Sequence, residues 1–343
     1  MTSAPFSTLL EIAGQAPLFL TPARQPFAKL PTGAVPLFSL EFHDWLYATL
    51  RTTGLSPHIA LNTFGRLLRS LDADLRAQPN PAIEPANLRV ATSPSGQYNV
   101  DLGPSGDVIK ITGKQWTRTS DPTPDAFLRP IASQPILEPA ASNTSLNQYL
   151  GKSFTLDEES ATKLNHWLQM ALRPDHPCPL LILTGEFRDE AAAAIRHLID
   201  PTACPVLPMP ASQKQMGEMA FYNSVLAFSI FNEITDARCN MIRGASQGNG
   251  FRLPQACSQR PPQTGTLRRP VILSAGKAPQ ICRNQIVIEI NSCLDLPEAE
   301  VLAALFNALV VTLRNEKPEE QWMPHSIASP IHQPAAHFSA SVP

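Results

Sequence analysis

The sequence predicts an α/β protein in which a mostly parallel sheet occupies the second half of the chain, preceded by a smaller α+β domain. In the second half, apolar and almost uncharged segments alternate with helical stretches, as in a parallel sheet that helices cover on both faces. In the first half, short apolar segments are separated by tight turns rich in glycine and proline, which is typical of antiparallel strands. The pattern changes at a Pro-rich stretch over residues 121–147.

The same changes of composition place the expected domain boundaries. We predict an N-terminal α+β domain at 1–120, a connector at 121–147, an α/β domain at 148–316 and a tail at 317–343. The connector holds five prolines, which make a linker stiff and extended. The tail is rich in proline and has no apolar period, so we expect it to be disordered.

The N-terminal domain is predicted to contain a strand pair, two helices and a β-meander. The strands at 17–22 and 26–31 flank a turn. The first helix presents an apolar face that includes Phe42, and the second opens at Ser56 and Pro57, an N-cap followed by proline at the first helical position. The strands of the meander are expected at 88–92, 98–102, 108–112 and 115–118.

The α/β domain is predicted to open with a helix at a capping box formed by Thr155 and Glu158. A buried strand then leads through a Gly-Glu pair into a helix at 189–199, and a long helix at 297–314 closes the domain. Because uncharged strands that alternate with helices are buried on both faces, we expect the strands to share one sheet. They are predicted at 179–184, 222–230, 270–274 and 285–290.

Composition indicates a cytoplasmic protein without a metal centre. The chain has no run of about 18 uncharged apolar residues, so we expect no membrane span. Its N-terminus lacks the basic and apolar regions of a secretory signal. The six cysteines never occur at the Cys-x-x-Cys spacing, which argues against a zinc site and against a disulfide scaffold.

The turn after the strand at 179–184 has the frame of a phosphate-binding loop without its working residues. Such a loop needs several glycines, a lysine for the β- and γ-phosphates, and a Ser or Thr for Mg²⁺. Here Gly185 is the single glycine and Arg188 is the single base before the helix, while Asp189 and Glu190 would repel a triphosphate. Taken alone, the segment favours an ordinary strand–turn–helix that never bound nucleotide.

Positive charge is concentrated in one stretch of the chain. The net charge is −2, yet residues 237–288 contain no Asp or Glu and eight Arg or Lys side chains. Such asymmetry indicates a surface that faces a polyanion. The alternative is that these cations pair with acidic side chains elsewhere in the fold, and the sequence leaves both open. The candidates for contact with DNA are Arg243, Arg252, Arg260, Arg268, Arg269 and Lys277.

Eight short stretches together carry a resemblance to a known family. They are FHDWL at 42–46, LRVA at 88–91, YNVDL at 98–102, FLRP at 127–130, LILTGE at 181–186, HLIDP at 197–201, NSVLAF at 223–228 and RPVIL at 269–273. In this order they resemble phage- and plasmid-encoded ATP-binding proteins related to superfamily 3 helicases, the primase-associated helicases of mobile elements. The resemblance implies a P-loop-NTPase-like, AAA+-like core, ring-shaped oligomers and movement along DNA.

Carried over position by position, the catalytic set of that family is absent. The loop keeps Gly185, Glu186 and Arg188 in place of a Gly-Lys-Ser/Thr signature. The second strand of the α/β domain has Ser229 where the family's Walker B Asp is expected, and the third has Ser274 where its sensor Asn is expected. A hydroxyl cannot replace the charge of a carboxylate beside Mg²⁺.

The sequence therefore predicts a pseudo-ATPase with no catalytic residues and no cofactor. We expect a non-catalytic homologue of a mobile-element replicative helicase that binds DNA or assembles with partners in replication or maintenance of a phage or plasmid-like element. Its expected partners are DNA, single-stranded by preference, and a second copy or a homologous helicase or primase. Two alternatives stay open: a diverged ATP-dependent helicase or NTPase with a non-standard nucleotide site, and a protein-binding regulator of a homologous helicase ring.

Overall fold

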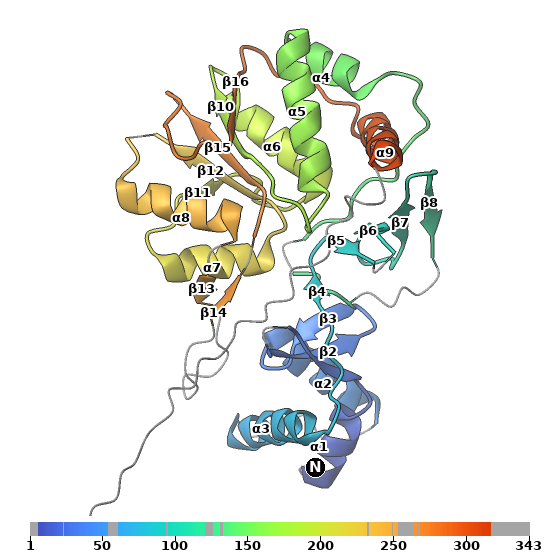
Figure 1. Cartoon of the computed structure of the whole chain (residues 1–343). Helices are drawn as coiled ribbons and strands as arrows, with labels where there is room; N and C mark the ends of the chain where they lie inside the picture. The colour runs from blue at the N-terminus through green and yellow to red at the C-terminus, as the bar shows by residue number, and fades with distance from the viewer. Residues whose placement is uncertain are drawn as a thin grey trace, which may run out of the picture.

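The computed structural model contains an α/β unit and a smaller N-terminal unit (Figure 1). The predicted tail at 317–343 and parts of the connector lie outside the described residues. Among the described residues, no helix combines the length and the apolar character that a bilayer crossing requires. The described residues are 6–22, 24–53, 61–93, 95–120, 126–130, 133–231, 233–248, 250–252, 264–266 and 268–316.

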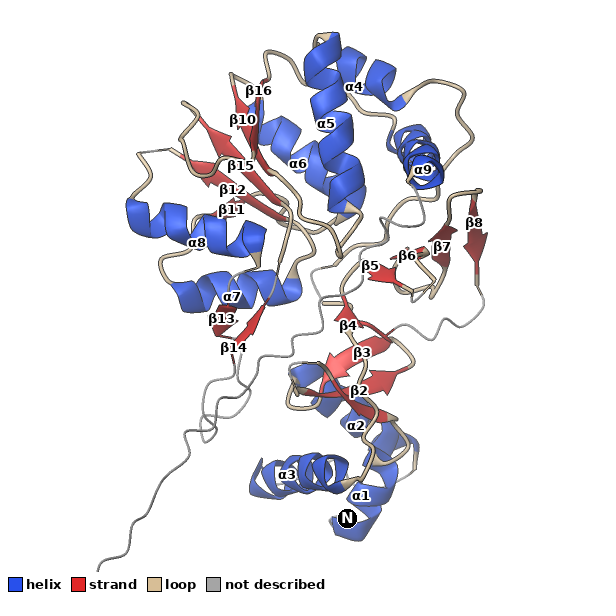
Figure 2. Ribbon diagram, in the orientation of Figure 1, coloured by secondary structure: helices blue, strands red, loops and turns tan. Residues whose placement is uncertain are grey.

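A five-stranded parallel sheet forms the centre of the α/β unit (Figure 2). Its order is β11-β12-β15-β10-β16, and all four strand pairs are parallel. The predicted parallel sheet is therefore confirmed, and its first strand is internal because β10 lies between β15 and β16. The bounds are β10 (Leu180–Thr184), β11 (Leu207–Pro208), β12 (Leu226–Ile230), β15 (Val271–Ala275) and β16 (Gln285–Glu289).

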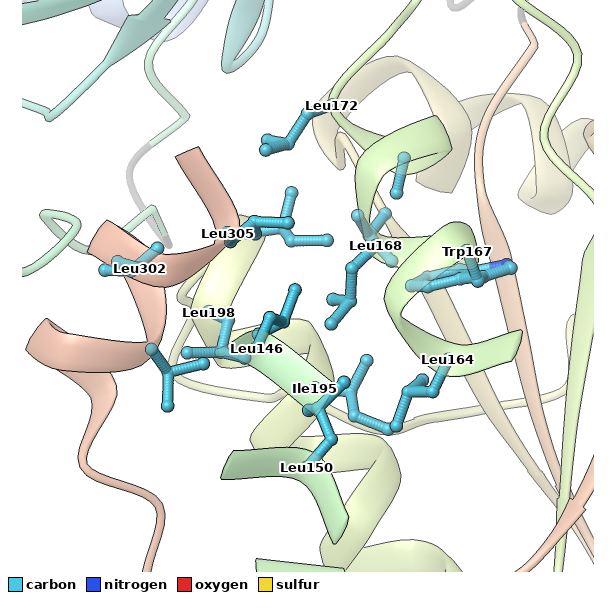
Figure 3. Packing of buried hydrophobic residues seen from close by; sticks show 14 of the residues in the cluster. Leu146, Leu150, Leu164, Trp167, Leu168, Leu172, Ile195, Leu198, Leu302 and Leu305 are labelled. Atoms are coloured by element: carbon cyan, nitrogen blue, oxygen red, sulfur yellow. The ribbon is translucent and has the colours of Figure 1, made fainter. Parts of the chain in front are cut away.

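Helices cover both faces of the sheet, as predicted, because successive side chains of each strand point to opposite faces. Leu181 and Leu183 join the core formed with α4, α5, α6 and α9, where leucines from these helices converge (Figure 3). Leu180 and Ile182 join the core formed with α7 and α8. The bounds are α4 (Leu146–Phe154), α5 (Glu158–Ala171), α6 (Arg188–Ile199), α7 (Gln213–Tyr222), α8 (Asp236–Gln247) and α9 (Glu298–Asn315).

The predicted capping box at Thr155 is wrong, because a helix that the sequence did not reveal ends there. Thr155 is the C-cap of α4 and has a left-handed backbone with φ 50°. The next helix, α5, is capped instead by Asp157, whose carboxylate accepts a hydrogen bond from the N–H of Ser160 at 2.7 Å. A capping box is present one helix earlier, where Ser145 and Gln148 open α4.

The predicted strand at 222–230 is correct only in its second half. Tyr222 is the last residue of α7, and β12 begins at Leu226. The N–H groups of Ser224 and Val225 donate to the carboxylate of Asp200, at 2.8 and 3.1 Å. These two residues therefore bond to a side chain instead of a neighbouring strand, and this contact sets where β12 starts.

The N-terminal unit combines an antiparallel sheet with helices that bury an apolar core. The predicted strand pair is confirmed as β1 and β2, and the predicted helix face at Phe42 is fully buried. The sequence did not reveal α1 or β3, and the predicted helix start at Ser56 and Pro57 lies outside the described residues. The bounds are α1 (Phe6–Ala13), β1 (Leu18–Leu20), β2 (Pro26–Leu30), β3 (Gly33–Pro36), α2 (Leu40–Thr52) and α3 (Leu61–Ala77).

The predicted meander is confirmed as a four-stranded antiparallel sheet in the order β5-β6-β7-β8. It packs on α9, where Trp116 donates through Nε1 to Asn307 at 2.9 Å and meets the ring of Phe306 at 5.8 Å. Most of its buried apolar residues belong to the same cluster as those of the α/β unit, and the predicted boundary at residue 120 stays a prediction. The bounds are β4 (Ala86–Asn87), β5 (Val90–Thr92), β6 (Tyr98–Asp101), β7 (Val108–Ile111), β8 (Trp116–Thr119) and β9 (Ala126–Phe127), with β4 and β9 paired in parallel.

Candidate functional site

The turn that follows β10 is closed against the end of β16. Gly185 has φ +95°, and a β-carbon at this position would lie 2.2 Å from the carbonyl oxygen of Ile290. The N–H of Ile290 donates to Thr184 at 2.8 Å, and the N–H of Phe187 donates back to Ile290 at 3.3 Å. Ile290 therefore occupies the N–H of Phe187, which a phosphate-binding loop would keep free for an anion.

The first turn of α6 supplies its own negative charge. Its N-cap, Phe187, makes no side-chain cap, and Asp189 and Glu190 follow. Carboxylates are stabilised at a helix N-terminus, and α6 supplies two of them from its own first turn. Arg188 turns back and donates through Nη1 to the carbonyl of Gly185 at 2.8 Å, while its Nε is buried with no partner among the described residues. Arg188 therefore stabilises the turn through this hydrogen bond.

Ser229 and Ser274 are directly opposite each other where β12 and β15 end. The hydroxyl of Ser274, which is fully buried, donates to the carboxylate of Asp189. The hydroxyl oxygen of Ser229 is buried and has no partner among the described residues. The structure thus brings together Gly185 with Arg188, and Ser229 with Ser274, while Glu186 is exposed.

Sequence reasoning missed the bond between Asp189 and Ser274. A signal for it was present, since Asp189 opens the helix after one strand and Ser274 lies near the end of another. Parallel strands end at the same edge of a sheet, which is where such side chains meet. Among the described residues, no three His, Cys, Asp or Glu side chains are grouped so that they could hold a metal ion.

Arg243 is used within the fold. Its Nε and Nη2 donate to the carbonyl of Ile281 at 3.2 and 2.8 Å, and its Nη1 donates to Asn240 at 2.8 Å. These bonds tie α8 to the segment between β15 and β16. The sequence left open whether Arg243 pairs with an internal carboxylate or is free to contact a phosphate. Its partners are a carbonyl and a side-chain amide, so neither alternative describes it.

Arg268 and Arg269 also bond to backbone carbonyls. Arg268 donates to Pro174 at 3.0 Å, and Arg269 donates to Ala220 at 2.8 Å and to Arg268 at 3.1 Å. Burial lowers the pKa of Arg268, and it lowers the pKa of Arg269 to about 10. Three of the six DNA-contact candidates are therefore engaged inside the protein.

The other three candidates are placed differently. Lys277 is exposed after β15. Arg252 ends β13 (Gly250–Arg252), which pairs antiparallel with β14 (Thr264–Thr266) in a short hairpin beside α7 (Figure 1). Arg260 lies outside the described residues.

A buried charge network at the amino end of the sheet was not predicted. Asp200 accepts from Nε of Arg89 at 3.1 Å and also bonds the two N–H groups before β12. Arg196, fully buried, donates to Asn223 at 2.6 Å and lies 3.9 Å from Asp200. Burial lowers the pKa of Arg196. The network joins the meander, α6 and β12, and it draws on four of the eight stretches that carry the family resemblance, through Arg89, Asp200, Asn223 and Arg269.

Comparison with known proteins gives only distant likenesses. No protein-family model matches the chain, and no curated protein matches it. Among solved structures, the apo C-terminal region of NrS-1 has a TM-score of 0.44 at 9% identity, covering 90% of this chain and 69% of that one. A full-length MCM homolog from Methanopyrus kandleri has a TM-score of 0.31 at 11% identity, covering 90% of this chain and 76% of that one. Likenesses at this level assign no activity to the chain.

Proposed function

We propose that this chain is a non-catalytic relative of mobile-element helicases that keeps an ATPase-like fold as a scaffold. The observation that carries the proposal is the contact between this turn and Ile290, because Ile290 accepts the N–H of Phe187 that a phosphate-binding turn would leave free for an anion. Phosphoryl transfer depends on positioning and on neutralising the charge of the phosphates. In place of a cation that is free to neutralise phosphate, the turn has Arg188, which is bonded to Gly185, and two carboxylates.

The scaffold role that we propose is in replication or maintenance of a phage or plasmid-like element. It would consist of DNA binding or of assembly with a second copy or a homologous helicase or primase. Support for DNA binding comes from the hairpin β13–β14, which lies inside the stretch without Asp or Glu. Because Arg243, Arg268 and Arg269 are bonded internally, phosphate contacts would fall mainly on Arg252 and Arg260.

Nucleotide binding is the direct test. The thermal unfolding midpoint should not change with millimolar Mg-ATP, since a specific ligand at 100 times its Kd would add about 2.7 kcal/mol to the free energy of unfolding. A saturable rise of several degrees that disappears in Arg188→Ala would establish the alternative of a diverged NTPase. Single-stranded DNA binding at two salt concentrations, with Arg252→Ala/Arg260→Ala as the variant, tests the DNA role separately.

A further inference from the structure

One buried guanidinium, that of Arg173, joins three elements of the fold. The residue follows the C-cap of α5, and its side chain is 4% exposed. Its Nη1 and Nη2 donate to the two carboxylate oxygens of Glu316 at 2.6 and 2.9 Å, and its Nε donates to the hydroxyl of Tyr98 at 3.3 Å. Because Glu316 is the C-cap of α9 and Tyr98 lies in β6, this side chain ties the end of α5 to the end of α9 and to the meander.

The turn at 174–177 adds an imidazole and a carboxylate to this junction. The N–H of His176 donates to the carbonyl of Arg173 at 3.0 Å, and its ring nitrogen Nε2 contacts Nη2 of the same arginine. Asp175 accepts from the hydroxyl of Tyr98, which lies 3.0 Å from each carboxylate oxygen. We call this set of side chains the α5 junction; it consists of Tyr98, Arg173, Asp175, His176 and Glu316.

The contact between the two cationic residue types of the junction requires a neutral imidazole. An arginine side chain has donors and no acceptor, so Nε2 of His176 accepts from Nη2 of Arg173. A histidine nitrogen accepts only in the neutral ring, whose proton is then on Nδ1. Protonation places an N–H on both ring nitrogens, and the contact then opposes two donors and two positive charges. The geometry of the junction therefore exists only while His176 is uncharged.

The surroundings of the imidazole favour this neutral form. Burial, and next the positive charge of Arg173, lower the pKa of His176. A lowered histidine pKa contributes stability that is complete above about pH 6.5 and is lost as the pH falls below that value. Tyr98 stays neutral in this range, since its pKa is about 12. The charged groups that face the ring from the described elements are Arg173, Asp175, Glu316 and Arg268, which precedes β15.

We propose that His176 is a pH-dependent switch that controls whether the end of α9 is held against α5. The neutral ring accepts from Arg173 and keeps the guanidinium against Glu316. The protonated ring repels the guanidinium, and the bidentate pair with Glu316 opens. Glu316 forms no other salt bridge within the described chain, so the last turn of α9 is then released.

The release acts at the point where residues 317–343 join the described fold, since they follow Glu316 directly. Proton binding and opening of the junction are linked, so each changes the equilibrium of the other by the same factor. Acidification would therefore change how the C-terminal segment is attached, without any change at the turn after β10. This switch does not rest on the function proposed above, and the two fail independently.

Hydrogen exchange of the full chain, measured by mass spectrometry at pH 7.5 and pH 5.5, tests the switch. Protection factors corrected for the intrinsic exchange rate remove the direct effect of pH, and ordinary carboxylates stay ionised at both values. In wild type, protection of the amides at 311–316 should fall roughly fivefold or more at the lower pH. His176→Gln offers a neutral acceptor that does not titrate, so its protection should be the same at both values.

Two further variants complete the test. His166→Gln replaces an exposed histidine of α5 and should respond to pH as wild type does. His176→Lys carries a permanent charge and should lack protection at 311–316 already at pH 7.5. Equal protection of wild type at both pH values, or the same fall in His176→Gln as in wild type, would overturn the switch. Loss of protection in His176→Gln at pH 7.5 would make the imidazole purely structural and would also overturn it.

Discussion

Gly185 and Ile290 lie in backbone contact although 104 residues separate them along the chain, and the contact closes the turn after β10. The contact excludes any side chain at position 185, since its β-carbon would overlap the carbonyl of Ile290. It also holds Gly185 at φ +95°, where a non-glycine residue is strained. The conformation of this turn is therefore fixed by the end of β16, the strand that neighbours β10 in the sheet.

Replacing Gly185 with alanine should lower the free energy of unfolding by about 2–4 kcal/mol, because strain and overlap act together. Urea denaturation monitored by circular dichroism measures the change. Gly276→Ala is the matched control, since its β-carbon would meet nothing within 4 Å, and it should stay within about 0.5 kcal/mol of wild type. Equal midpoints for Gly185→Ala and wild type would show that the turn is open in solution.

Replacing Ser229 with alanine and replacing Ser274 with alanine should have different effects on the free energy of unfolding. Ser274→Ala removes the donor to a carboxylate and should cost about 1.5–3 kcal/mol of folding free energy. Ser229→Ala removes a buried hydroxyl that has no partner among the described residues, so it should be neutral or stabilising. The same denaturation measurement compares them. A larger loss for Ser229→Ala than for Ser274→Ala would mean that the carboxylate of Asp189 bonds elsewhere.

Tyr98 should give stability a dependence on alkaline pH. Burial, and next the nearby carboxylate of Asp175, raise the pKa of Tyr98 from its usual value of about 10 to about 12. A raised pKa contributes stability that is complete below pH 10 and is lost as the pH rises towards 12. Tyr98→Phe loses the hydrogen bond to Asp175 at neutral pH but lacks this titration.

The difference in free energy of unfolding between wild type and Tyr98→Phe should therefore shrink by roughly 2 kcal/mol between pH 9 and pH 12. Guanidinium denaturation across this range measures it, and taking the difference removes the contribution of lysines common to both proteins. A constant difference between wild type and Tyr98→Phe across this range would contradict the assignment.

Asp200→Asn should be among the most damaging single changes, at about 3–5 kcal/mol, because it leaves buried arginines without their counter-charge. Arg89 is 2% exposed and Arg196 is fully buried, so neither gains compensation from water. Thermal unfolding measures the loss. Glu159→Gln breaks an exposed ion pair with Lys163 and should change stability by less than about 1 kcal/mol. Similar midpoints for the two variants would show that the Asp200 network is solvated.

Four of the five strands of the sheet were predictable because they are apolar and separated by helical periods, whereas β11, with two residues, was not predicted. Helix α4 was missed because its nine residues directly follow a Pro-rich connector that predicts extended chain. The start of β12 was missed for a different reason. Residues 222–225 have the composition of a strand, and the contact that stops the strand comes from Asp200 on another element.

The residues of the candidate site could be predicted from the sequence, but the contacts that they make could not. Ser229, Ser274 and the single glycine of the turn are visible in the sequence. The insertion of Ile290 into the turn depends on where β16 ends in three dimensions, and no local pattern encodes that. In the same way, the carbonyl partners of Arg243, Arg268 and Arg269 carry no sequence signal, because every residue has a carbonyl.

The carboxylate of Asp200 also determines which substitutions this chain can tolerate. Segments from the meander, α6, the start of β12 and the start of β15 all place an arginine or a backbone N–H against or near it. A change in any one of these segments leaves the others with an unmatched charge or donor, so they can vary only in concert. The described side chains of the turn at Gly185 lie outside this network. Apart from Gly185 itself, they are therefore free of the constraint that Asp200 imposes.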